Sequence, residues 1–178
     1  MNLRDNPAHF GLVSRVLHWG MALLLLWQYL SMIGRLMFGR GPITGFMVGS
    51  HASVGTLLLM LVLLRGAWGF YNWRRRPTHG THIVGRLAAL GHFALYGLMF
   101  LVPSLSLIRQ FGAERPFAFF GIPVLPGREQ PIEWLVAIGD TLHGEMAWTL
   151  SALIVGHIGM VAIHQLVWRD DTLKRMAG

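Results

Sequence analysis

The 178-residue sequence contains no cysteine. This absence excludes disulfide bonds, thiolate zinc sites and iron–sulfur clusters. Charge is also scarce, because Asp, Glu, Lys and Arg together make up 13 % of the chain, about half the fraction found in soluble domains. A soluble protein of this size needs more charge to cover its surface, so the composition excludes soluble enzymes, disordered tails and fibrous repeats.

Hydrophobic residues, in contrast, make up 53 % of the chain, and fifteen basic residues outnumber eight acidic ones to give a formal net charge of +7. We therefore predict an integral membrane protein. Its basic residues are better explained by the bilayer than by nucleic acid, which we do not expect as a partner, because basic residues flank membrane spans. Membrane lipid is the first partner that the composition indicates.

Four stretches lack Asp, Glu, Lys and Arg and are long enough to cross the hydrocarbon core, which takes about 20 apolar residues. They are Val16–Gly34, Gly41–Leu64, Leu87–Ile108 and Met146–Trp168. We predict an all-α fold, a four-helix membrane bundle formed by one domain over residues 1–178. Its spans are expected at about residues 12–36, 43–70, 85–109 and 142–169.

The basic residues beside these spans are unevenly distributed between the two sides of the membrane. Ten lie on one side: Arg4, Arg15, Arg65, Arg74, Arg75, Arg76, Arg86, Arg169, Lys174 and Arg175. Five lie on the other: Arg35, Arg40, Arg109, Arg115 and Arg128. Because cytoplasmic loops carry the excess of Lys and Arg, both termini are predicted to be cytoplasmic. The longest connection, Arg109–Leu142, then faces the outer side.

Nine histidines are present, although an imidazole is costly in hydrocarbon and is normally functional there. Three of them fall outside the spans and are expected to be solvated: His9, His79 and His82. The other six lie in or near the spans: His18, His51, His92, His143, His157 and His164.

The spacing within the fourth span is informative. Fourteen residues separate His143 from His157, which on a helix leaves them about 40° apart on one face and about 21 Å apart in height. Each is therefore placed to bind a metal centre at its own membrane level. His51 matches His143 at the outer level, whereas His18 and His92 compete as the partner of His157 at the inner level.

Imidazole ligands suit zinc, copper, iron and nickel, but the lack of thiols and of intramembrane carboxylates argues against most closed zinc sites. Two bis-imidazole sites inside a helix bundle are what two b-type haems require. Their propionates need basic partners, for which the candidates are Arg15 and Arg86 on the inner side and Arg35 and Arg40 on the outer side.

Short motifs along nearly the whole chain match those of a known family in the same order and in a single alignment. They are RVLHW at Arg15–Trp19, SHASVG at Ser50–Gly55, LGHFALY at Leu90–Tyr96, PFAFFG at Pro116–Gly121, LHGE at Leu142–Glu145, Gly156–His157, His164 and the tail Trp168–Met176. On these motifs the chain resembles the bacterial cytochrome b561 family, which is related to the b subunits of nickel hydrogenases and formate dehydrogenases. The resemblance implies a multi-pass protein of the bacterial inner membrane.

The resemblance also implies a ligand set of four histidines. It pairs His51 with His143 for the outer haem and His18 with His157 for the inner haem, and it assigns neither His92 nor His164 as a ligand. Depth alone leaves His92 as an alternative to His18. Some family members carry a further histidine three residues before the position of His92, where this chain has Ala89, so no role transfers to that position.

The function implied is transmembrane electron transfer through the two haems to or from a membrane quinone. Some family members suggest a superoxide:ubiquinone oxidoreductase, which oxidises superoxide at the outer face, and His92 and His164 are the candidates for the quinone site. One alternative is a membrane-anchor subunit that takes electrons from a dehydrogenase or hydrogenase partner. Another is a haem-free channel or transporter lined by histidines.

Overall fold

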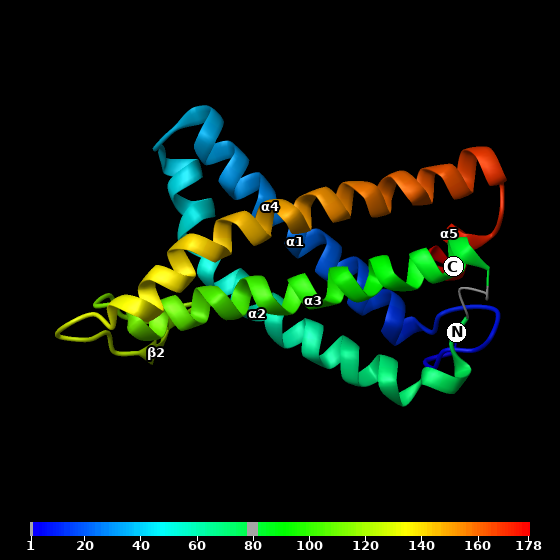
Figure 1. Cartoon of the computed structure of the whole chain (residues 1–178), viewed down its shortest axis with the longest axis horizontal. Helices are drawn as coiled ribbons and strands as arrows, with labels where there is room; N and C mark the ends of the chain where they lie inside the picture. The colour runs from blue at the N-terminus through cyan, green and yellow to red at the C-terminus, as the bar shows by residue number, and fades with distance from the viewer. Residues whose placement is uncertain (1, 78–81) are drawn as a thin grey trace.

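A computed structural model of the chain describes residues 2–77 and 82–178, so His79 lies outside the described residues. Four long helices dominate it: α1 (Leu12–Phe38), α2 (Pro42–Tyr71), α3 (Ile83–Gly112) and α4 (Glu133–Ile163). They run lengthwise through the molecule (Figure 1). All four are long and apolar enough to cross a membrane, as predicted.

Short elements flank these helices. A 3₁₀ turn η1 (Trp73–Arg75) follows α2, a π-helical turn η2 (His164–Trp168) continues α4, and a short helix α5 (Thr172–Ala177) ends the chain. The helix α4 begins at Glu133, well before the predicted span, and its extra turns include charged residues. A hydropathy criterion stops at such residues, whereas a helix continues beyond the hydrocarbon core, and an acidic first turn suits the helix dipole.

The connection between α1 and α2 is a tight turn of three residues. Gly39 adopts a positive φ of 68° and its amide donates to the carbonyl of Arg35, which ends α1. Pro42 then opens α2, and the Thr44 hydroxyl accepts a hydrogen bond from the Gly41 amide. This local chemistry makes α1 and α2 antiparallel neighbours.

The described helices pack mainly as the pairs α3 with α4, α1 with α2, and α2 with α3. A small apolar core fills the middle of the bundle: Met21, Val54, Leu58, Val62, Met99, Val102 and Leu150. Towards the hairpin end, α3 and α4 approach closely at Gly139, where a Cβ would lie 3.0 Å from the carbonyl oxygen of Leu105. Most other large apolar side chains are exposed.

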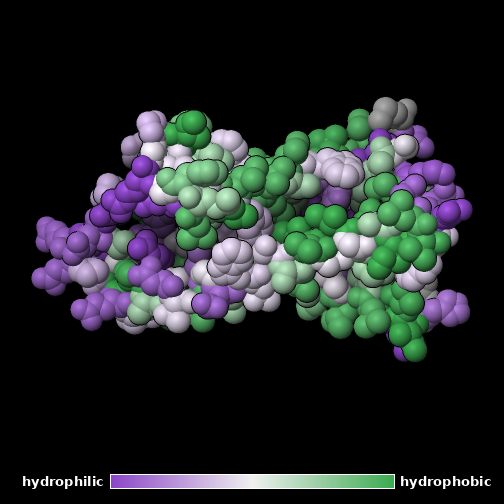
Figure 2. Space-filling model, turned by 90° about the horizontal axis from the view of Figure 1, so that it is seen from above, coloured by the Kyte–Doolittle hydropathy of each residue, from purple (hydrophilic) through white to green (hydrophobic). Residues whose placement is uncertain are grey.

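The distribution of side chains on the surface fits a lipid environment. Figure 2 shows hydrophobic side chains over the middle of one face and hydrophilic ones gathered towards the ends, most densely at the end that carries the hairpin. Exposed apolar side chains are favourable only where hydrocarbon covers them. The long axis of the bundle therefore lies across the membrane.

A β-hairpin interrupts the connection between α3 and α4 of this mostly helical fold, a short element that the all-α prediction did not include. Strands β1 (Phe117–Phe119) and β2 (Ile122–Leu125) pair in antiparallel fashion. Phe120 and Gly121 join them with φ values of 47° and 89°. Positive φ at both central residues is typical of the tightest hairpin turns. Neighbouring prolines prevent a helix here.

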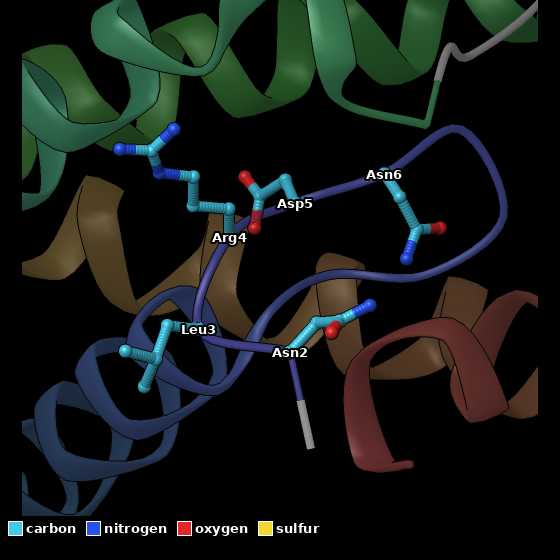
Figure 3. A pocket seen from close by; sticks show the side chains of 5 residues that line it. All are labelled: Asn2, Leu3, Arg4, Asp5 and Asn6. Carbon is cyan, nitrogen blue, oxygen red and sulfur yellow. The ribbon is translucent and has the colours of Figure 1, made fainter.

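The two termini lie at the same end of the bundle, opposite the hairpin (Figure 1). In the N-terminal segment Asp5 is buried, accepts a hydrogen bond from the Gly11 amide at 2.8 Å and pairs with Arg76 at 3.3 Å. Figure 3 shows Asp5 between Arg4 and Asn6, just before the chain of this segment turns back. The Phe10 amide also donates to the carbonyl of Arg175 at 3.0 Å, so the segment is fixed to both the α2–α3 loop and α5.

Candidate functional site

At the outer level, near the hairpin, the structure brings His51 of α2 and His143 of α4 together. Their ring centres are 6.3 Å apart and their planes cross at 74°. The His51 Nδ1 lies 3.2 Å from the Ser31 hydroxyl oxygen, and this hydroxyl donates its own proton to the Gln28 carbonyl. The His143 Nδ1 lies 2.9 Å from the carbonyl oxygen of Val102.

These contacts assign the ring tautomers. A carbonyl only accepts hydrogen bonds, so the Nδ1 of His143 carries its proton and donates it. The Ser31 hydroxyl has already donated, so it accepts from the Nδ1 of His51. Both imidazoles are left with an Nε2 lone pair, and such a hydrogen bond at the other nitrogen is how metal-binding histidines are held.

At the inner level His18 of α1 lies beside His157 of α4, again with ring centres 6.3 Å apart and planes at 74°. His92 of α3 is nearer to His157, with ring centres 5.3 Å apart. Its Nδ1 lies 2.7 Å from the carbonyl oxygen of Ala88, one turn earlier in α3. The structure therefore places three imidazoles at this level and two at the outer one.

The separations distinguish the pairs. An imidazole nitrogen binds a first-row metal at about 2 Å and the ring centre lies about 1 Å behind it, so two imidazoles on opposite sides of one metal have centres about 6 Å apart. The pairs His51–His143 and His18–His157 have this separation. The ring centres of His92 and His157 are about 1 Å closer together than this separation. Two bis-imidazole sites, and hence b-type haem iron, therefore fit the donors present.

A buried arginine at the inner level is a functional candidate that the sequence reasoning missed. Arg65 of α2 is only 9 % exposed, its Nε has no hydrogen-bond partner, and its guanidinium carbon lies 5.3 Å from the ring centre of Tyr96. The sequence offered one signal, since Arg65 follows His51 by fourteen residues, the spacing that also separates His143 from His157.

The four arginines predicted as propionate partners lie towards the ends of the bundle. Arg15 uses its guanidinium to donate to the carbonyl of Ala177 at 2.6 Å, which joins α1 to α5. Arg35 is half-buried in the last turn of α1, while Arg40 and Arg86 are exposed. Their placement leaves Arg65 as the buried guanidinium among the described residues.

The hairpin covers the outer level through a serine close to His51. Ser53, two residues further along α2, accepts a hydrogen bond from the Phe120 amide at 3.0 Å and donates to the Ala118 carbonyl at 3.3 Å. Phe117 of the hairpin is buried. The β-turn is therefore held directly on the helix that carries His51, a contact that no local pattern in the sequence indicates.

His164 lies beyond the inner pair, in the π-helical turn at the end of α4. Its Nδ1 is 2.6 Å from a carboxylate oxygen of Asp170, and its ring packs edge-on against Trp168 with centres 4.6 Å apart. Hydrogen bonds from Thr172 and from His164 lower the pKa of Asp170 to about 2. The carboxylate thus joins the end of α4 to the start of α5.

Comparison with known proteins gives one family. The sequence model of the family described as prokaryotic cytochrome b561 matches residues 9–178. A curated relative named cytochrome b561 homolog 2, from Escherichia coli (strain K12), is 28 % identical over 186 residues, an alignment that covers 100 % of this chain and 96 % of the relative. The matched region contains all four long helices and both imidazole pairs.

The Asp170 contacts predict how the C-terminal tail responds to mutation. Changing Asp170→Ala removes the acceptor for His164 and for the Thr172 amide, so peptide 165–178 should exchange its amide hydrogens several-fold faster at pH 7. Hydrogen–deuterium exchange with mass spectrometry measures this. The matched control is Asp171→Ala, which loses only an exposed ion pair to Lys174 and should leave the exchange rate unchanged.

The sign of the pH dependence follows from the lowered pKa. The stabilisation from Asp170 is complete above the ordinary carboxyl pKa, near pH 4, and is lost as the pH falls towards 2. Equal exchange in the Asp170→Ala variant and the unmodified chain at pH 7 would contradict this role of the carboxylate.

Proposed function

Because the chain belongs to the prokaryotic cytochrome b561 family, we propose that it transfers electrons across the bacterial inner membrane through two b-type haems. The observation that carries the proposal is the presence of two imidazole pairs with equal ring separations of 6.3 Å at two levels of the bundle. The family implies haem b and transmembrane electron transfer. The number of haems and their ligands are part of the proposal.

In this proposal His51 and His143 hold the outer haem iron through their Nε2 atoms. A bound haem supplies an iron that takes up and releases one electron without leaving the protein. The protein contributes the orientation of the two rings, through the hydrogen bonds of their Nδ1 atoms to Ser31 and Val102. Neutral imidazoles held in this way are ready to bind a metal without losing a proton.

His18 and His157 hold the inner haem in the same proposal. The equal ring separations of the two pairs support this choice, and the shorter separation of His92 from His157 argues against the alternative. His92 also directs its Nδ1 to the carbonyl of Ala88 within its own helix. It remains beside the inner site as a candidate contact for a quinone.

The residues between the two levels separate the haems with apolar side chains. Leu150 is buried halfway between His143 and His157 on α4, and Met21, Leu58 and Met99 from the other helices pack around it. This layer excludes water from the middle of the bundle and fixes the two sites relative to each other.

For the finer function we propose that superoxide is the electron donor at the outer face and ubiquinone the acceptor at the inner face. The positive residues Arg35 and Arg40 at the outer end attract a small anion, whereas Arg109 is already ion-paired with Asp140. At the inner end His164 offers an imidazole hydrogen-bonded to Asp170 as a proton donor for a quinone head. Both termini then lie in the cytoplasm.

Replacement of either outer histidine tests the first pairing. His51→Ala and His143→Ala should each lower the haem-to-protein ratio from about two to about one and remove the same component of the reduced spectrum, because each removes one of the two histidines that would hold that haem. Pyridine haemochrome analysis and redox difference spectra measure both effects. Loss of different components in the two variants would disprove the pairing, and a wild-type protein without haem bands would favour a channel.

The inner pairing predicts a different pattern for three histidines. His18→Ala and His157→Ala should each remove the inner haem, while His92→Ala should keep both haems, because the rings of His92 and His157 are closer together than the rings of the two pairs that would hold the haems. The same spectra provide the measurement. The assignment is wrong if His92→Ala loses the inner haem while His18→Ala retains it.

The quinone site can be tested through His164, which lies seven residues and about 10 Å beyond His157 towards the inner surface. Haems reduced by superoxide should be reoxidised by added ubiquinone, and His164→Phe should slow only this reoxidation, about tenfold or more, with both haem spectra intact. Stopped-flow spectroscopy separates the two steps. A lost haem would make His164 structural, and unchanged reoxidation would place the quinone elsewhere.

A further inference from the structure

A charge inside the membrane-spanning part of the bundle is the least expected feature of this fold. Among the described residues only two charged side chains are buried, Asp5 in the N-terminal segment and Arg65 in α2. Arg65 follows the charge-free stretch Gly41–Leu64 and is only 9 % exposed, although α2 continues to Tyr71. Burying a guanidinium in apolar surroundings is costly, so the position calls for a functional explanation.

No counter-ion neutralises this charge among the residues that the structure describes. The nearby carboxylate of Asp5 forms its ion pair with Arg76 instead. The Nε of Arg65 has no hydrogen-bond partner, and the guanidinium lies over the face of Tyr96 at 5.3 Å. A ring face attracts a cation without cancelling its charge. Arg65 thus has a free donor and a net positive charge in the bundle interior.

The charge lies at the inner level. Arg65 is fourteen residues beyond His51 on α2, which corresponds to about 21 Å along the helix and nearly the same helix face. Its contact Tyr96 lies one turn beyond His92 on α3, and His92 lies beside His157. Both the position of Arg65 along α2 and this contact place its charge at the inner level.

The outer level has no equivalent among the described residues. The arginines predicted for it are Arg35, which is half-buried at the end of α1, and Arg40, which is exposed, while Arg109 of α3 is exposed and already ion-paired with Asp140. The charges of exposed groups are screened by water and salt, whereas a buried charge acts over a longer range. The two imidazole pairs are alike in geometry but differ in the charge beside them.

We infer that Arg65 raises the reduction potential of the inner haem relative to the outer haem and so favours the passage of electrons inwards. The inference rests on the two-haem site of the proposed function. Reduction lowers the positive charge of a haem by one, so a buried cation stabilises the reduced form. In the exchange, one electron leaves the outer iron and enters the inner iron, and no proton or bond is transferred.

Removing the charge tests the inference. Arg65→Met should shift the reduction equilibrium of the inner haem at least tenfold towards the oxidised form, which is about 59 mV for one electron, while Arg65→Lys should shift it much less. Redox titrations in a His51→Ala background follow the inner haem alone, and titrations in a His18→Ala background follow the outer haem. The matched control is Arg74→Met, an exposed arginine whose loss should leave both potentials unchanged.

The outcomes are distinguishable. An unchanged inner potential in Arg65→Met, a shift as large in Arg65→Lys, or an equal shift of the outer haem would each overturn the inference. If Arg65→Met does not fold, Arg65→Gln removes the charge and keeps hydrogen-bond donors, and the same shift is expected. A wild-type chain that lacks two separate haems would instead refute the proposed function.

Discussion

Each imidazole of the outer pair has two ring nitrogens that need partners within the bundle. One nitrogen of each ring finds an oxygen inside the bundle, the hydroxyl of Ser31 for His51 and the carbonyl of Val102 for His143. The other nitrogen, Nε2, then carries the one free lone pair of the ring. The hydrogen bond at the first nitrogen fixes the direction in which this lone pair points. The oxygens of Ser31 and Val102 therefore occupy one nitrogen of each ring and leave the other nitrogen available as a ligand atom.

One helix sets both levels of the site. α4 contributes an imidazole to each pair, while its partners come separately from α2 at the outer end and from α1 at the inner end. The apolar core between the levels and the close approach of α3 to α4 at Gly139 hold this helix in place. The two sites therefore need no direct contact with each other, because the rigid helix that they share fixes their relative position.

The sequence predicts the helices and the histidine levels well because hydropathy and helical period are local properties. It does not predict the hairpin that rests on Ser53, or the acceptors of His51 and His143, because these partners come from distant parts of the chain. Arg65 is assigned to the cytoplasmic side by a rule that counts charges, whereas packing buries it. At the inner level, depth leaves the choice between two imidazoles open, and the structure places both His18 and His92 beside His157, with ring centres 6.3 and 5.3 Å away.

The spacing of His143 and His157 along α4 also limits which insertions this helix tolerates between them. One inserted residue would turn His157 by about 100° around α4 and direct its ring away from His18. Seven inserted residues would restore the face within about 20° but move the ring about 10 Å further along the helix. Four inserted residues would return the ring to within about 40° and move it about 6 Å. The distance between the two levels can therefore change only in steps close to whole helical turns, and insertions of one or two residues would break one of the two sites.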